Sequence, residues 1–162
     1  MGYINLDVNT VRKYCEDIFE KRGYTRQESE DIVDVLLTAD LYGIESHGIQ
    51  RLIRYHLAIE EGSILPGVKP EIVFQSPISM VMDAPKSMGQ VVSKAGMNMA
   101  IDMAKKHGVG AVCVRGSNHY GIAGYYTKMA ANADMVGICM TNTEAIAIPT
   151  YGKKAMLGTS PI

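Results

Sequence analysis

The sequence predicts an α/β fold in which a helical amino-terminal segment is followed by a mixed sheet with packed helices. Three observations support this prediction. Apolar side chains recur at helical spacing before the chain reaches a proline- and glycine-rich loop at 61–70, and short β-branched runs alternate with helix-like stretches after it. We therefore expect two regions, a helical segment over 1–70 and the first part of an α/β domain over 71–162.

Two helices are expected before residue 43. Apolar residues at helical spacing cover residues 8–19, and Gly23 ends that helix. A second helix is expected to open at Thr25, because the Thr25 hydroxyl and the Glu28 carboxylate form a capping box that satisfies backbone donors at a helix start. Gly43 interrupts the apolar periodicity and marks the end of this second helix.

The remaining elements are expected on both sides of the loop at 61–70. A third helix is predicted over about 48–60, with the following residues facing inward: Ile49, Leu52, Ile53 and Leu57. The elements predicted beyond the loop are, in order, strands over 71–75 and 79–83, a helix over 89–107, a strand over 109–114, a helix over 122–133 and a strand over 135–140. Strands that alternate with helices in this way predict at least one parallel strand pair.

Composition limits the classes of function. The chain carries 16 basic and 17 acidic side chains, a balance that argues against nucleic acid as its main partner. Neither a membrane span nor a secretory signal is predicted, because the sequence shows no long apolar segment and no basic-then-apolar start. Three separated cysteines without a pairing pattern predict reduced thiols in the cytoplasm.

A polar loop at 115–121 holds the first candidate for a chemical role. It follows the β-branched run 109–114 and precedes an expected helix, where α/β proteins bind ligands because strand carboxyl ends and helix amino ends open there. His119 lies in this loop, and an imidazole with a pKa near neutrality suits proton transfer. The alternative is a histidine that is hydrogen-bonded in the loop for structural reasons alone.

A second candidate cluster lies at the start of the third expected helix. Arg51 follows His47 by four residues, so a helix would place the imidazole and the guanidinium on one face, which Tyr55 continues. A guanidinium grips a carboxylate through two parallel hydrogen bonds, and a histidine beside it can polarise a carbonyl or move a proton. The alternative is that Arg51 pairs with a surface acid and His47 caps the helix.

Known cofactor and metal motifs do not occur in the sequence. Gly108 and Gly110 precede a strand and Cys113 stands in place of a third glycine, so the Rossmann fingerprint is absent. No cluster of histidine, cysteine and acidic residues predicts a metal site. A hydrolase that uses Ser46 and His47 is disfavoured, because adjacent helical residues point in different directions and no acidic partner stands at a recognisable spacing.

Three segments of the chain resemble, in order, the signature of the non-Rossmann malate/L-lactate dehydrogenase family, which includes ureidoglycolate and sulfolactate dehydrogenases. Residues 39–52 (ADLYGIESHGIQRL) resemble its ADxxGIxSHGxxRL pattern, and residues 115–126 (RGSNHYGIAGYY) resemble its SNH(F/Y)GxAGYY segment. Residues 141–143 and 157–161 (LGTSP) are similar to its N(S/T) and GTNP stretches, with Ser160 in place of the usual asparagine. The likeness covers nearly the whole chain.

The resemblance implies a role for each matching residue. His119 and His47 match the histidines that transfer the proton in different members of the family. Ser46 and Arg51 match its substrate-carboxylate site, to which we add Tyr55 from the same expected face. The residues expected to contact the cofactor are Asn142, Thr143, Gly158 and Thr159.

The resemblance also implies an activity, with two kinds of alternative. It implies a homodimeric cytoplasmic oxidoreductase that transfers a hydride between NAD or NADP and a small 2-hydroxy acid of the malate or lactate type. A ureidoglycolate, sulfolactate or cyclic-imine carboxylate substrate is the alternative within the family. The second alternative is that the chain is catalytically incomplete and serves only as a folding or dimerisation unit. Residues 151–162 resemble an unfinished strand or loop, so we expect the chain to be the amino-terminal part of a longer polypeptide.

Overall fold

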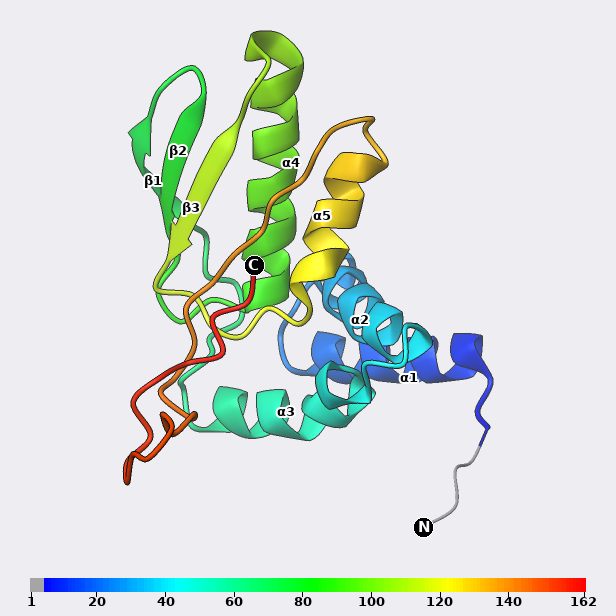
Figure 1. Ribbon diagram of the computed structural model, residues 1–162. Coiled ribbons are helices and arrows are strands. Elements are labelled where there is room, and N and C mark those ends of the chain that lie inside the picture. The colour runs from blue at the N-terminus through cyan, green and yellow to red at the C-terminus, as the bar shows by residue number, and fades with distance from the viewer. Residues whose placement is uncertain (1–4) are drawn as a thin grey trace. The chain divides into compact units, whose positions relative to one another are not determined.

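The computed structural model describes residues 5–162, which form an α/β fold divided into two compact units (Figure 1). The first unit ends at Ile122, and the second runs over Ala123–Ile162. The boundary that the sequence suggests at residue 70 lies within the first unit and stays a prediction. None of the helices within residues 5–162 has the length and apolar character needed to cross a membrane.

The first unit begins with helices whose ends are fixed by side-chain caps. Its helical elements are α1 (Val8–Lys21), α2 (Arg26–Leu41), two 3₁₀ turns, η1 (Glu45–His47) and η2 (Ile49–Arg51), and α3 (Leu52–Glu60). Asp7 caps α1 by accepting a hydrogen bond from the backbone of Thr10. The capping box predicted at Thr25 and Glu28 is confirmed at the start of α2.

The third expected helix starts later than predicted. Residues 45–51 form the two 3₁₀ turns, and the α-helix begins only at Leu52. Gly43 adopts a left-handed backbone with φ of 73°, which ends α2 and redirects the chain. The carboxylate of Asp40 at the end of α2 then accepts a hydrogen bond from the backbone N–H of Ile49 at 2.8 Å, and so holds the tight turns against α2.

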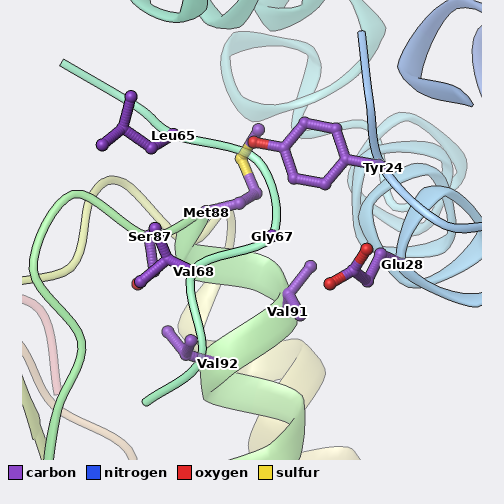
Figure 2. A pocket seen from close by; sticks show the side chains of 9 residues that line it. All are labelled: Tyr24, Glu28, Leu65, Gly67, Val68, Ser87, Met88, Val91 and Val92. Atoms are coloured by element: carbon purple, nitrogen blue, oxygen red, sulfur yellow. The ribbon is translucent and has the colours of Figure 1, made fainter. Parts of the chain in front are cut away.

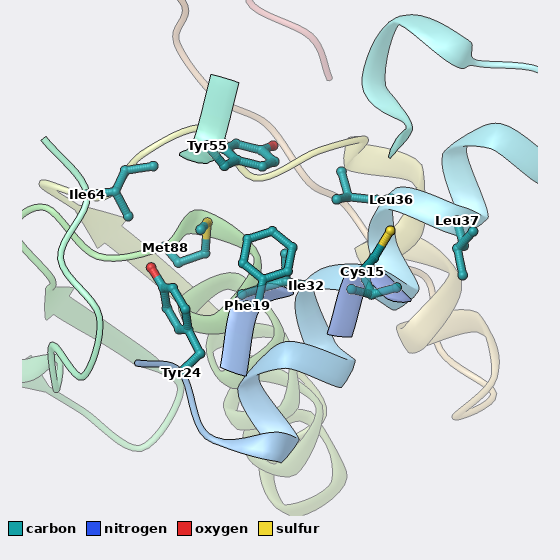
Figure 3. Packing of buried hydrophobic residues seen from close by; sticks show 10 residues of the cluster. Cys15, Phe19, Tyr24, Ile32, Leu36, Leu37, Tyr55, Ile64 and Met88 are labelled. Carbon is teal, nitrogen blue, oxygen red and sulfur yellow. The ribbon is translucent and has the colours of Figure 1, made fainter. Parts of the chain in front are cut away.

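The core of the first unit lies between these helices and the start of α4. Phe19, Ile32, Leu36, Tyr55 and Met88 are all at most 2% exposed and pack in one cluster (Figure 3). Two residues of α3 expected to face inward instead face outward, since the side chains of Ile53 and Leu57 are 68% and 51% exposed. The short α3 buries only Tyr55 completely, and residues 49–51, which the helix predicted over 48–60 included, form a 3₁₀ turn instead.

A mixed three-stranded sheet completes the first unit. Its strands are β1 (Glu71–Gln75), β2 (Ser79–Asp83) and β3 (Ala111–Arg115), in the order β1-β2-β3. β1 and β2 form an antiparallel hairpin, and β2 pairs with β3 in parallel after the crossover helix α4 (Gly89–His107). The predicted parallel pair is therefore confirmed. α4 packs on the sheet (Figure 1), and a Cβ at Gly96 would lie 3.3 Å from the side chains of Val112 and Val114 on β3.

The second unit contains α5 (Ala123–Ala131) followed by extended chain. The strand expected over 135–140 is wrong: within the described chain these residues pair with no strand, and only an isolated bridge joins Ala147 to Leu157. A strand exists only where a neighbour satisfies its backbone groups, so an apolar β-branched run is insufficient. The side chains of Val136 and Ile138 are 94% and 67% exposed.

Candidate active site

Two histidines far apart in the sequence form a stacked pair in the first unit. His47 comes from η1, and His119 comes from the loop that follows β3. Their ring centroids lie 5.3 Å apart with an interplanar angle of 29°. The structure thus brings together the two residues that the sequence singled out independently as candidates for proton transfer.

Close backbone approaches fix the loop that carries His119. Gly121 has a left-handed φ of 84°, and a Cβ at this position would collide with the side chain of Val35 on α2. Gly89, the first residue of α4, leaves no room for a Cβ against the backbone of Asn118 and His119. Only glycine fits both positions, so α2 and α4 hold the His119 loop from two sides.

A buried tyrosine forms a hydrogen bond with the ring of His119. The hydroxyl of Tyr55 lies 2.6 Å from Nδ1 of His119, and the amide Nε2 of Gln90 donates to the same hydroxyl at 2.7 Å. Tyr55 and Gln90 are 1% and 0% exposed. Tyr55 was expected to bind substrate; the structure places its hydroxyl at the His119 ring, and the substrate role stays a prediction.

Burial keeps both imidazoles neutral at physiological pH. Desolvation, followed by the positive charges of His47, Arg51 and Arg54, lowers the pKa of His119 to about 4. Desolvation and the nearby Arg51 also lower the pKa of His47. Desolvation outweighs the hydrogen bond from Gln90 and raises the pKa of the Tyr55 phenol to about 12, so this hydroxyl keeps its proton.

Ser46 and Arg51 lie beside His47, in a geometry that differs from the expected helical face. The Ser46 hydroxyl is 2.9 Å from Nδ1 of His47, and Nε of Arg51 donates to the Ser46 carbonyl at 2.6 Å. The 3₁₀ turns therefore place the guanidinium next to the histidine pair by tethering it to the turn. This Nε contact uses one of the five N–H donors of the guanidinium, and its positive charge suits an anionic ligand.

The residues expected to contact a cofactor belong to the second unit. The hydroxyls of Thr143 and Thr159 lie 3.4 Å apart, and the Thr143 hydroxyl accepts the backbone N–H of Ser160 at 3.3 Å. Gly158 packs so closely on Thr143 that a Cβ would collide with it. The structure thus brings three of the four predicted residues together, while the fourth, Asn142, is exposed beside them in the chain.

Two residues of the first unit were missed by sequence reasoning. Asp40 anchors the turn that carries His47, and its place in the family-like segment 39–52 was the available signal. Gln90 had no signal, because a glutamine near a helix start is ordinary in sequence and its contact with Tyr55 joins residues 35 positions apart.

Within the described part of the chain, the cavity beside the amino-terminal helices and the metal-binding residue types offer no second site large enough for a metabolite or arranged for a metal. A small cavity beside Tyr24 and Met88 has a volume of about 10 Å³, enough for a single water molecule and too small for a metabolite (Figure 2). Among residues 5–162 no group of histidine, cysteine and acidic side chains is arranged to hold a metal ion.

Comparison with known proteins identifies the family of the chain. A sequence model described as malate/L-lactate dehydrogenase matches residues 6–162. The chain is 44% identical over 151 residues to the L-sulfolactate dehydrogenase of Methanocaldococcus jannaschii, which covers 93% of the chain and 44% of that relative. It is 41% identical over 161 residues to the malate dehydrogenase of Pyrococcus abyssi, which covers 99% of the chain and 44% of that relative.

Solved structures show the same fold. The malate dehydrogenase of Pyrococcus horikoshii OT3 superposes with a TM-score of 0.95 at 38% identity, over 99% of this chain and 48% of that one. These likenesses in sequence and fold place the chain among relatives of oxidoreductases. More narrowly, the chain belongs to the malate/L-lactate dehydrogenase family, and it spans less than half the length of these curated relatives.

Proposed function

We propose that the protein transfers a hydride between a nicotinamide cofactor, NAD or NADP, and a small 2-hydroxy acid of the malate, lactate or sulfolactate type. The observation that supports this most strongly is the stacked pair of His47 and His119 beside Arg51. Relatives named malate dehydrogenase and L-sulfolactate dehydrogenase agree in substrate class, since both names describe 2-hydroxy acids that also carry a second acidic group.

Arg51 is the residue we assign to the substrate carboxylate. A bidentate guanidinium contact would fix the carboxylate and so orient the neighbouring carbon for hydride transfer. Arg54 adds a second positive charge close enough to lower the pKa of His119. The Ser46 carbonyl accepts the Nε–H of Arg51 and its hydroxyl contacts His47, so we assign Ser46 to the same substrate-binding cluster.

We assign a different role toward the substrate oxygen to each of the two histidines. His47 is the less perturbed of the pair and is the better carrier for the proton that leaves the hydroxyl in oxidation and returns in reduction. His119, neutral at physiological pH, contributes a hydrogen bond to the same oxygen. General acid–base assistance of this kind typically contributes a factor of about 10²–10⁴ in rate.

The threonine-lined group of the second unit is our candidate for cofactor contacts. Asn142, Thr143 and Thr159 offer hydroxyl and amide groups, and Gly158 allows close backbone approach, which suits the polar ribose and phosphate groups of a dinucleotide. When bound, the nicotinamide accepts or supplies the hydride. Cys15, Cys113 and Cys139 are reduced, which fits a cytoplasmic setting for this chemistry.

A substrate panel tests the proposal. The full protein is mixed with malate, L-lactate, L-sulfolactate and ureidoglycolate, and with each of NAD and NADP, while the absorbance of reduced nicotinamide is followed. We expect turnover with at least one malate- or lactate-type acid. Turnover restricted to ureidoglycolate would move the substrate assignment elsewhere in the family, and inactivity with all four acids would refute the proposal.

A second candidate function is that of a folding or dimerisation unit. It is favoured by the strongly exposed apolar side chains of the second unit, among which Val136 is 94% exposed and Ile148 is 60% exposed. Sedimentation of the chain, with and without NADH, separates the two functions. If the chain self-associates and NADH changes neither the sedimentation of the chain nor the NADH fluorescence, the function as a folding or dimerisation unit is favoured.

A further inference from the structure

A chain of buried hydrogen bonds runs from α4 through α3 to the ring of His119. It begins at the side-chain amide of Gln90, passes through the hydroxyl of Tyr55, and ends at Nδ1 of His119, with distances of 2.7 Å and 2.6 Å. Both supporting side chains are fully buried, so water does not compete for these bonds.

The backbone of Gly121 determines the direction of this chain. Its N–H donates to Nδ1 of His119 at 3.3 Å, and a backbone N–H can only donate. Nδ1 is therefore an acceptor and carries no proton. The Tyr55 hydroxyl must then donate to Nδ1, which leaves the Tyr55 oxygen to accept the N–H of Gln90, as the structure shows.

From this geometry we propose that Gln90 and Tyr55 are positioning residues that hold His119 in the tautomer with its proton on Nε2. The inference rests on the proposed function in one respect, which is that the Nε2–H is then presented to the oxygen of the substrate. Neither positioning residue touches the substrate. Both act by fixing which nitrogen of His119 carries the proton.

The rest of the surroundings is consistent with a neutral ring. His47, Arg51 and Arg54 face His119 with groups that carry or can carry positive charge, and together with burial they lower its pKa to about 4. Two donors aimed at Nδ1 oppose a second proton there as well. His119 therefore enters the reaction as a hydrogen-bond donor with a defined tautomer.

The side-chain amide of Gln90 lowers the stability of the fold through its oxygen. Its Oε1 is buried and has no hydrogen-bond partner among the described residues. An unpaired buried amide oxygen is destabilising, so an apolar side chain of similar size would serve a purely structural role at this position better. The donated N–H to Tyr55 is the interaction that distinguishes glutamine from such a side chain.

Histidine-selective ¹⁵N labelling of the full protein tests the proposal without cofactor or substrate. Long-range ¹H–¹⁵N correlation at neutral pH distinguishes protonated from unprotonated ring nitrogens, and the His119→Asn variant assigns the signals. We expect His119 to carry its proton on Nε2 and none on Nδ1. A proton on Nδ1 in the unmodified protein would overturn the proposal outright.

Two variants test whether the support, and not burial alone, sets the tautomer. Gln90→Met keeps the side-chain length and removes the donor, and Tyr55→Phe removes the hydroxyl. Each should increase the fraction of His119 with its proton on Nδ1. Val92→Ala is the matched control, because Val92 is buried on the same helix without a part in the chain of bonds. An unchanged tautomer in both variants, or an equal change in the control, would contradict a positioning role.

Turnover separates this inference from the proposed function. If both stand, Gln90→Met lowers kcat by about tenfold or more with little change in KM for the cofactor, a fraction of the ~10⁴ that a wrong histidine tautomer costs in a catalytic triad. The expected tautomer in a protein without hydride transfer leaves the positioning role intact and refutes the proposed function. The opposite tautomer in an active protein refutes the positioning role and leaves the proposed function intact.

Discussion

The partial burial of His119 leads to a quantitative prediction about stability and pH. In the folded chain its pKa is lowered from 6.5 to about 4. The folded state then binds fewer protons than the unfolded state between these two values, so stability is complete above pH 6.5 and is lost as the pH falls towards 4. One pKa unit corresponds to about 1.4 kcal/mol, so His119 alone should lower the free energy of unfolding by about 3 kcal/mol over this range.

His119→Asn isolates this contribution. Asparagine keeps an acceptor near the position of Nδ1 for the Tyr55 hydroxyl and the Gly121 N–H, and it does not titrate. Urea unfolding of both proteins at several pH values between 7 and 4 gives the difference in slope. The unfolding free energy of the variant should fall by about 3 kcal/mol less than that of the unmodified protein.

The same substitution at an exposed histidine is the matched control. His107 lies in the last turn of α4 and is exposed, so His107→Asn tests whether a histidine-to-asparagine change away from the site alters the pH dependence as His119→Asn does. If His119→Asn and the unmodified protein lose stability in parallel between pH 6.5 and 4, the lowered pKa of His119 is refuted.

Two further predictions concern the substrate and the loop. Arg51→Lys keeps the positive charge and loses the bidentate grip, so KM for the carboxylate substrate should rise about tenfold with a smaller effect on kcat, and steady-state kinetics with an unchanged KM would remove Arg51 from the substrate site. Gly121→Ala should destabilise the protein by about 1–3 kcal/mol or more, because φ is 84° and the new Cβ meets Val35. Its control is Gly124→Ala, which has no positive φ and meets nothing within 4 Å, so thermal unfolding should change little; equal effects of both alanines would contradict the packing of the His119 loop.

Local signals in the sequence predicted the local structure. The capping box at Thr25 and the parallel strand pair around α4 depend on neighbouring residues or on a repeated pattern, and both were confirmed. The strand over 135–140 was wrong because strand formation depends on a partner, which no local pattern contains. Ile53 and Leu57 were wrongly predicted to face inward, because the helical periodicity was extended through turns that Asp40 holds in 3₁₀ form.

The residues of the site could be predicted from the sequence, but the hydrogen bonds between them could not. Resemblance and residue chemistry identified His47, Arg51 and His119, and the structure brings them together. The bond between Tyr55 and His119 spans 64 positions, and the one between Gln90 and Tyr55 spans 35. Contacts of this range follow from the packing of α3 and α4 on the loop, so the tautomer of His119 can be inferred only from the folded chain.

Isotope transfer tests the central claim most directly. The full protein is incubated with malate or L-lactate that carries deuterium on the hydroxyl-bearing carbon, together with oxidised nicotinamide, and the reduced cofactor is analysed by mass spectrometry. The account predicts that the deuterium appears in the reduced nicotinamide, and that His47→Asn and His119→Asn suppress this transfer while circular dichroism shows an intact fold. Absence of deuterium in the cofactor, or undiminished transfer in both variants, would contradict it.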